Sequence, residues 1–138
     1  MQEITIIENE LPSDTYRHLR VVSGLSAKSV EASEKGLPNS LFTVLVKKGE
    51  QSIGMGRVIG DGGCFCQVVD ICVHPEFQGQ GLGKQIMQSI TNYIREHLPA
   101  SCYVSLIADG DAAFLYEKFG FMDTLPASKG MYLDFTEL

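Results

Sequence analysis

Residues 73–83 read VHPEFQGQGLG and decide the fold prediction, because three glycines follow an apolar stretch and precede an amphipathic one. The apolar stretch, residues 65–73, predicts a buried strand that is central in its sheet. Apolar residues recur every four positions over residues 82–98 and predict a helix, which Pro99 ends. A glycine-rich loop at a helix N-terminus presents free backbone N–H groups and the positive end of the helix dipole. Such a loop binds phosphate.

The spacing of the glycines disfavours two common phosphate loops. A P-loop needs Gly-x4-Gly-Lys followed by Ser or Thr, whereas Gln85 follows Lys84 here. A dinucleotide fingerprint needs G-x-G-x-x-G in an early strand–helix–strand unit, whereas Gly79, Gly81 and Gly83 alternate in the middle of the chain. The loop therefore belongs to another class of phosphate site.

The remaining elements follow from hydrophobic period and turn residues. Strands are predicted at residues 3–8, 41–47, 52–59 and 102–108, with a final hairpin at 121–124 and 131–135. Helices are predicted at residues 13–23, 27–35 and 109–118, capped by Ser13, by Ser26 and by Asp109 or Asp111, with Gly120 closing the last helix. The strand, loop, helix and strand of residues 65–108 form a parallel βαβ unit. The predicted fold is α/β with a mixed sheet.

Composition bounds the function classes. The 138 residues carry 11 Lys and Arg against 17 Asp and Glu, a net charge of −6 that argues against a nucleic-acid binder. Apolar runs such as residues 41–46 are far shorter than the roughly 18 residues of a membrane span, and the N-terminus lacks a basic region. We expect one cytoplasmic domain over residues 1–138, without membrane or nucleic-acid partners.

The cysteines and histidines give little support to a metal site. Cys64, Cys66, Cys72 and Cys102 lie in or beside apolar segments, so we interpret them as reduced thiols that pack like small hydrophobes. The pair at 64 and 66 is C-x-C without a matching second pair, and the three histidines are scattered. No metal ligand is predicted.

The glycine loop resembles the acyl-CoA signature of the GNAT superfamily of N-acetyltransferases, [Gln/Arg]-x-x-Gly-x-[Gly/Ala], at Gln78, Gly81 and Gly83. Its context strengthens the resemblance, because residues 73–77 match Val-x-Pro-Glu-aromatic at a strand end. Residues 114–121, FLYEKFGF, resemble the family ending Tyr-x-x-x-Gly-Phe. The order of elements also fits, so the resemblance covers nearly the whole chain.

The resemblance implies a GNAT-like fold, a mixed sheet flanked by helices, and direct acetyl transfer from acetyl-CoA to a primary amine in a ternary complex without a metal. The loop amides would hold the CoA pyrophosphate, and the strand edge would pair with the pantetheine arm where family members splay two parallel strands apart. The implied CoA-binding residues are Ile71, Cys72, Val73, Gln78, Gly79, Gln80, Gly81, Leu82, Gly83 and Lys84.

Direct transfer needs a neutral amine, yet an alkylamine of pKa about 10.4 is neutral in about one molecule in 2,500 at pH 7. A water-relayed base, desolvation or a nearby positive field would lower this cost. Asp70 is the candidate base, with Gln67 contributing its amide only. Asp70 fits a structural role equally well, as a backbone cap or as a partner of Arg57.

The leaving thiolate needs a proton, for which Tyr116 is the candidate donor, since the family places a Tyr within reach of the CoA sulfur. The alternative is a Tyr packed beside Phe114 and Phe119. A backbone N–H of Cys72 or Val73 would polarise the thioester carbonyl. The thiol of Cys72 itself has no assignable base partner and is a poor nucleophile.

The sequence says least about the acceptor that would receive the acetyl group. We expect a small-molecule amine, attracted by Glu31 and Glu34 on the second helix together with Asp61 and Asp123, although surface solvation explains these carboxylates as well. One alternative is a non-catalytic acyl-CoA sensor, and another is acetylation of protein lysines or N-termini. Homodimers are common in the family, so a homodimer is a further expectation.

Overall fold

The structure is a computed structural model that describes residues 2–138. The chain divides into two compact units, one that ends at Leu106 and one that spans Ile107–Leu138. The prediction of a single domain over residues 1–138 stays a prediction. Among the described residues, no helix is long and apolar enough to cross a membrane.

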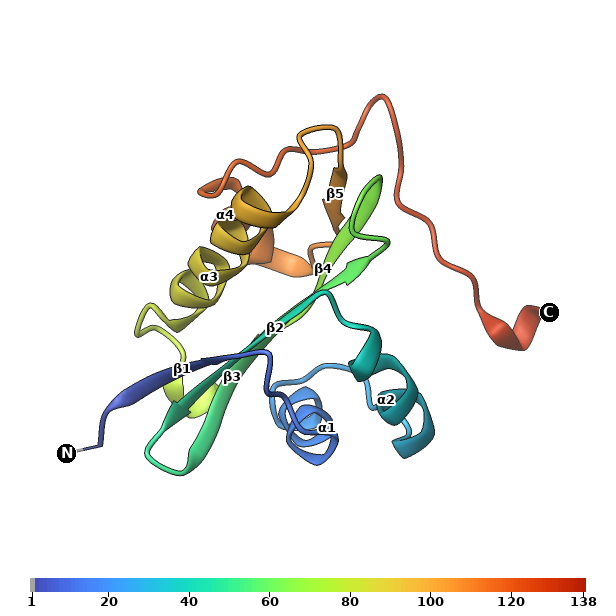
Figure 1. Ribbon diagram of the computed structural model, residues 1–138. Helices are drawn as coiled ribbons and strands as arrows, with labels where there is room; N and C mark the ends of the chain where they lie inside the picture. Colours follow the sequence, from blue (N-terminus) through green and yellow to red (C-terminus); the bar gives the residue numbers. More distant parts are fainter. Residues whose placement is uncertain (1) are drawn as a thin grey trace. The chain divides into compact units, whose positions relative to one another are not determined.

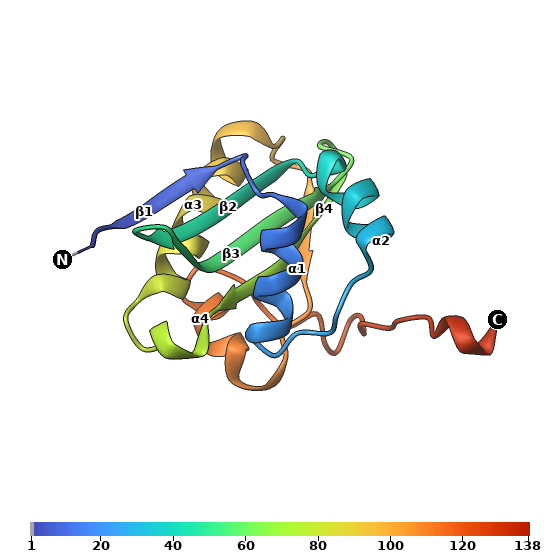
Figure 2. The same cartoon turned by 90° about the horizontal axis from the view of Figure 1, so that it is seen from below.

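The first unit is a five-stranded sheet in the order β1-β2-β3-β4-β5, with α1 and α2 on one face and α3 on the other (Figures 1 and 2). Strands β1 to β4 are antiparallel neighbours, and β4 pairs with β5 in parallel. The predicted mixed sheet flanked by helices is therefore confirmed. The elements are β1 (Ile4–Glu8), α1 (Ser13–Val22), α2 (Val30–Gly36), η1 (Leu37–Asn39), β2 (Phe42–Lys48), β3 (Gln51–Gly60), β4 (Phe65–Val73), η2 (Pro75–Phe77), α3 (Leu82–His97) and β5 (Tyr103–Leu106).

The core of this unit lies on both faces of β2 and β3. On the α3 side, Ile86 and Ile90 pack so closely over Gly56 that an added Cβ would lie within 3 Å of both side chains. On the α1 side, Leu19 packs with Met55 in one buried cluster. The apolar residues that recur every four positions in α3 thus pack against the sheet.

Strand β4 is not the central strand that its apolar sequence predicted. It lies fourth of five, and β3 is the middle strand. Only residues 65–68 of β4 pair with β5, because β5 is four residues long. Among the described residues, the rest of β4 has no ladder partner on that side. Helices that cover both sheet faces account for its apolar residues without a central place.

Two predicted helix caps are wrong. Pro12, not Ser13, is the N-cap of α1, and no side chain caps that helix. Helix α2 begins three residues later than predicted, with Ser29 as its cap. Ser26 is engaged elsewhere, because Arg20 donates to its carbonyl at 2.7 Å and to its hydroxyl at 3.0 Å. Ser26 and Ser29 are both good caps by sequence, and the contact of Ser26 with Arg20, six residues away, leaves Ser29 as the cap.

The second unit contains η3 (Gly110–Ala112), α4 (Ala113–Glu117) and η4 (Phe135–Glu137). The predicted closing role of Gly120 is confirmed, because it has a φ of 95° and the following amide bonds back to Tyr116 O at 3.3 Å. Asp109 is the N-cap of η3, although its side chain makes no cap hydrogen bond.

The predicted hairpin at residues 121–124 and 131–135 is wrong, because the structure has no strand in the second unit. The segment is rich in apolar and aromatic residues, but two short strands without a covered face are marginal at best. Seven large apolar side chains of residues 122–138 are 62% to 89% exposed. They are Met122, Leu125, Met131, Tyr132, Leu133, Phe135 and Leu138.

Candidate active site

The glycine loop reaches α3 through two residues in the left-handed region. Gly79 and Gly81 have φ values of 79° and 81°, which favour glycine, and a Cβ on either would meet nothing within 4 Å. Gly81 is the N-cap of α3, and the amide of Gln85 is the first to bond back, to Gly81 O at 3.1 Å. The amides of residues 82–84 thus have no acceptor within the helix. This geometry can hold an anion.

The open edge of β4 leads directly into this loop. The amide of His74 donates to Ile53 O on β3 at 2.7 Å. Because amide directions alternate along a strand, the Cys72 amide also faces β3 and the Val73 amide faces the open edge. The Gln78 side chain donates to Val73 O at 3.1 Å, which places that carbonyl on the loop side. Of the two predicted thioester donors, alternation favours Val73.

A β-bulge interrupts β4 just before this edge. Gly56 of β3 is the single residue opposite two residues of β4, Asp70 and Ile71, because Arg57 pairs with Val69 and the next β3 pair is Met55 with Cys72. Asp70 has a φ of 61°, which is uncommon for a residue other than glycine. Bulges of this kind re-aim the strand beside functional sites.

The Asp70 carboxylate holds the bulge to α1 and β3. It accepts a hydrogen bond from the Tyr16 hydroxyl at 3.1 Å and forms ion pairs with Arg20 and, at 3.4 Å, with the Arg57 Nε. Its side chain is 6% exposed. Pairing with Arg57, which the sequence left open, is confirmed. Both oxygens are engaged inside the protein, so these contacts support the structural role of Asp70 and not the role of a base.

Tyr16 and Arg20 were not predicted as part of the site. They lie four residues apart on α1, so both side chains fall on one helix face, but a helix pattern does not say which strand that face meets. Burial, together with the Asp70 carboxylate, raises the pKa of Tyr16. The phenol therefore acts as a neutral donor to Asp70.

Cys72 lies on the same face of β4 as Asp70. Its thiol is buried, and its sulfur lies 3.8 Å from Leu19 O. Burial raises the pKa of Cys72 to about 11. A protonated, packed thiol agrees with the predicted absence of a nucleophilic role.

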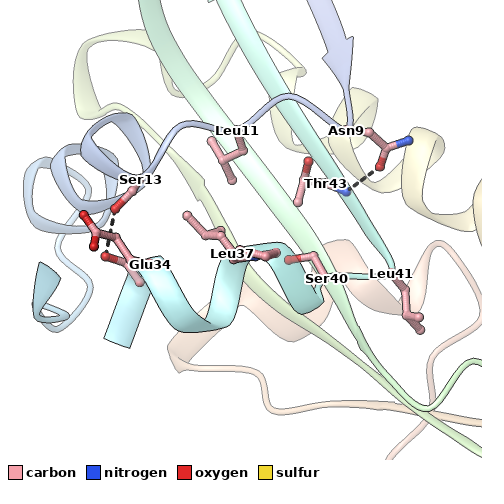
Figure 3. Close-up of a pocket in the computed structure, with 10 residues that line it drawn as sticks. Asn9, Leu11, Ser13, Glu34, Leu37, Ser40, Leu41 and Thr43 are labelled. Carbon is pink, nitrogen blue, oxygen red and sulfur yellow. Dashed lines mark hydrogen bonds between the residues drawn. The ribbon is translucent and has the colours of Figure 1, made fainter. Parts of the chain in front are cut away.

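A pocket of about 620 Å³ opens on the α1 and α2 side of the sheet (Figure 3). Hydroxyl groups are frequent in its wall, and Glu34 is its single carboxylate. The pocket adjoins the Asp70 cluster through Arg57, because Thr43 in the wall pairs with Arg57 across β2 and β3. The lining residues are Asn9, Leu11, Ser13, Ser33, Glu34, Leu37, Pro38, Ser40, Leu41 and Thr43.

The predicted acceptor-binding carboxylates separate in the structure. Glu34 lines the pocket, whereas Glu31 pairs with Lys35 at 3.4 Å on an exposed helix face. Asp61 is used locally, because its Oδ1 accepts three successive backbone amides of the β3–β4 turn. These bonds lower the pKa of Asp61. Glu34 is therefore the carboxylate best placed to meet a cation in the pocket.

Tyr116 lies in α4 of the second unit. It is buried, and its ring meets Phe121 edge to face at 6.3 Å between centroids. Phe114, named in the packing alternative, is 65% exposed. The role of Tyr116 as an acid stays a prediction.

Comparisons with known proteins identify the family and the fold of this chain. Residues 38–123, more than half of the chain, match the family described as acetyltransferase (GNAT) domain. The uncharacterized N-acetyltransferase ycf52 of Porphyra purpurea is 31% identical over 97 residues, which are 68% of this chain and 55% of that protein. The chain therefore belongs to the GNAT acetyltransferase family. It spans about half the length of the first curated relatives.

Two solved structures resemble the whole chain. A probable acetyltransferase of unknown function from meticillin-resistant Staphylococcus aureus is 50% identical, with a TM-score of 0.90 over 96% of this chain and 99% of that one. A GNAT family acetyltransferase from Streptococcus pneumoniae is 25% identical, with a TM-score of 0.79 over 96% and 98% of the two chains. Both agree with the family assignment.

Proposed function

We propose that this protein transfers an acetyl group from acetyl-CoA to the primary amine of a small molecule. One observation carries the proposal. The β4 edge beyond Val68 is open among the described residues, and it leads within a few residues to the glycine loop and the free amides of α3. In CoA, the amides of the pantetheine arm would match the open strand edge, and the pyrophosphate that follows them would match the glycine loop and the α3 amides.

The residues present fit acetyl-CoA as the cosubstrate. Val73 offers an amide and a carbonyl at the open edge for pantetheine, and the amides of residues 82–84 suit the pyrophosphate. Acetyl-CoA supplies the thioester whose acetyl carbon the amine attacks, and the CoA thiolate leaves. Tyr116 would return a proton to that thiolate.

The buried cluster of Asp70, Arg20 and Arg57 favours deprotonation of the acceptor amine by a positive field, without a carboxylate base. Arg20 and Arg57 bring two positive charges against the single negative charge of Asp70. A net positive field lowers the pKa of a nearby ammonium, which raises the fraction of neutral nucleophile. The proton lost by the amine would then leave through water.

The pocket beside this cluster supports a small acceptor. Its volume lies in the range of small-molecule sites, and its hydroxyl groups with Glu34 suit a polar amine. Replacing Glu34 by Gln should raise KM for a cationic acceptor while kcat changes little. Glu31→Gln is the matched control, because Glu31 lies on the same helix and is paired with Lys35.

The decisive experiment measures acetyl-CoA consumption and CoA release against amines, polyamines, aminoglycosides, amino acids and Lys peptides. Product detection by mass spectrometry avoids interference from the exposed Cys64 thiol. Turnover with one small amine supports the proposal, and turnover with Lys peptides alone favours a protein acetyltransferase. Binding of acetyl-CoA without any turnover favours a sensor, and the absence of binding contradicts the proposal.

We also propose a homodimer and a cytoplasmic location. Seven large apolar side chains of residues 122–138 are exposed, more than a monomer usually leaves to solvent, and a second copy offers the same side chains in return. We infer the cytoplasmic location from the free cysteines and from the proposed use of acetyl-CoA. Fractionation of cells that express the full-length protein tests it.

A further inference from the structure

Three of the four cysteines meet where β4 and β5 begin. Tyr103 donates its amide to Cys64 O at 2.8 Å, and Cys66 pairs with Val104 in the parallel ladder. Cys102, which directly precedes β5, therefore lies beside residues 64–66. The thiol of Cys102 donates to the sulfur of Cys66, and the two sulfur atoms are 3.4 Å apart.

We propose that Cys66 and Cys102 are a reversible oxidation site, a dithiol that a hydroperoxide converts to a disulfide. The two thiols lose two electrons and two protons, and the hydroperoxide ROOH is reduced to ROH and water. The sulfur atoms need to approach from 3.4 Å to about 2.05 Å, a shift of about 1.4 Å that side-chain rotation and small strand movement can supply. The proposal does not depend on acetyl transfer.

The surroundings of Cys66 and Cys102 favour disulfide formation over metal binding and over irreversible oxidation of these two sulfurs. Among the described residues, no group of three His, Cys, Asp or Glu side chains is placed to hold a metal ion. Cys72 is separate from the cluster, because its thiol faces α1. Cys64 is exposed and Cys66 is 3% exposed, so irreversible over-oxidation is expected at Cys64 first.

The protonation of Cys102 sets the conditions for the reaction. Desolvation and the hydrogen bond to Cys66 raise the pKa of Cys102 to about 11. Cys102 is thus a thiol at neutral pH. Once peroxide has converted one of the two thiols to a sulfenic acid, the other sulfur attacks it, the S–S bond forms, and the hydroxide that leaves takes up the released proton to give water. The rate should increase with pH from 7 to 9, because thiolates are the reactive forms.

The disulfide would close a loop of 36 residues that contains the bulge, the glycine loop and α3. Closing a loop of this length stabilises the folded state by restricting the unfolded chain. The melting temperature of the oxidised protein should therefore be higher, by about 5 to 10 °C.

The test uses the reduced full-length protein and hydrogen peroxide, followed by alkylation and peptide mapping. We expect loss of two hydrogen masses, one peptide linked between Cys66 and Cys102, the higher melting temperature, and reversal of both by dithiothreitol. The link should disappear in Cys66→Ser and in Cys102→Ser. It should persist in Cys64→Ser and Cys72→Ser.

Three results would overturn the proposal. They are a link from Cys64 to Cys102, oxidation that ends in sulfinic acid without a link, and links between molecules only. Circular dichroism of each reduced variant checks that it is folded. If Cys66→Ser fails this check, Cys102→Ala provides the same test at a less buried position.

Discussion

The Asp70 carboxylate joins three elements, and its removal would leave the buried Arg20 and the half-buried Arg57 without a carboxylate partner. We predict that Asp70→Ala lowers the free energy of unfolding by about 3–5 kcal/mol. Urea denaturation followed by circular dichroism measures it. Glu31→Ala is the control, because its ion pair is exposed and should cost less than about 0.5 kcal/mol. Equal losses for the two variants would contradict the prediction.

Tyr116 differs from Phe by one hydroxyl group, the group assigned to protonate the thiolate. We predict that Tyr116→Phe lowers kcat by about 100-fold or more, the usual effect of losing a general acid. The dissociation constant for CoA, measured by calorimetry, should change little. Unchanged turnover would remove Tyr116 from the mechanism.

Single residues were the hardest part to predict from the sequence. The partner of Asp70 on β3 could be proposed because Arg57 lies on a neighbouring predicted strand. Tyr16 and Arg20 could not, because nothing local specifies that the α1 face meets the bulge. The left-handed φ of Asp70 is likewise imposed by a register shift with β3 and has no signal of its own.

At the scale of elements, the turn into α3 depends on backbone that only glycine adopts easily. We predict that Gly81→Val weakens acetyl-CoA binding by at least tenfold, because the left-handed N-cap is lost and the loop amides turn away. Gly24→Val is the matched control, since Gly24 has a φ of 86° and equally open surroundings. It should reduce stability and leave binding intact. Loss of binding in both variants would show a general effect of unfolding.

The β3–β4 turn should make stability depend on pH. Backbone hydrogen bonds lower the pKa of Asp61 in the folded state. A lowered pKa contributes stability above the unfolded value of about 3.9, and that stability is lost as pH falls through the folded value. We predict that wild type exceeds Asp61→Asn in stability at pH 6 and that the difference shrinks steadily as the pH falls below about 3.9. Urea titrations at several pH values measure it.

The elements themselves were predicted well where period and turn agreed. Residues 65–73 form β4 with both ends as expected, and α3 begins at Leu82. The prediction failed for the hairpin at residues 121–135, where apolar and aromatic residues suggest strands but no strand is present in that unit. It also misplaced β4 in the sheet, since strand order follows pairing and not hydrophobicity alone.

At the scale of the whole molecule, the exposed apolar C-terminal segment should control assembly. We predict that Phe135→Asp shifts the protein from dimer to monomer, because a buried charge without a partner is costly at an interface. Light scattering after size exclusion measures the mass. Val21→Asp is the control, because Val21 is also exposed but lies on α1. A monomeric wild type would contradict the homodimer proposal.

The open edge of β4 also bears on how the protein behaves in storage. Unpaired strand backbone is a template for aggregation, since a strand from another molecule can add to it. A ligand that forms hydrogen bonds with the amide and carbonyl of Val73 occupies that template. Solutions that contain CoA should therefore stay clear longer than solutions of the protein alone.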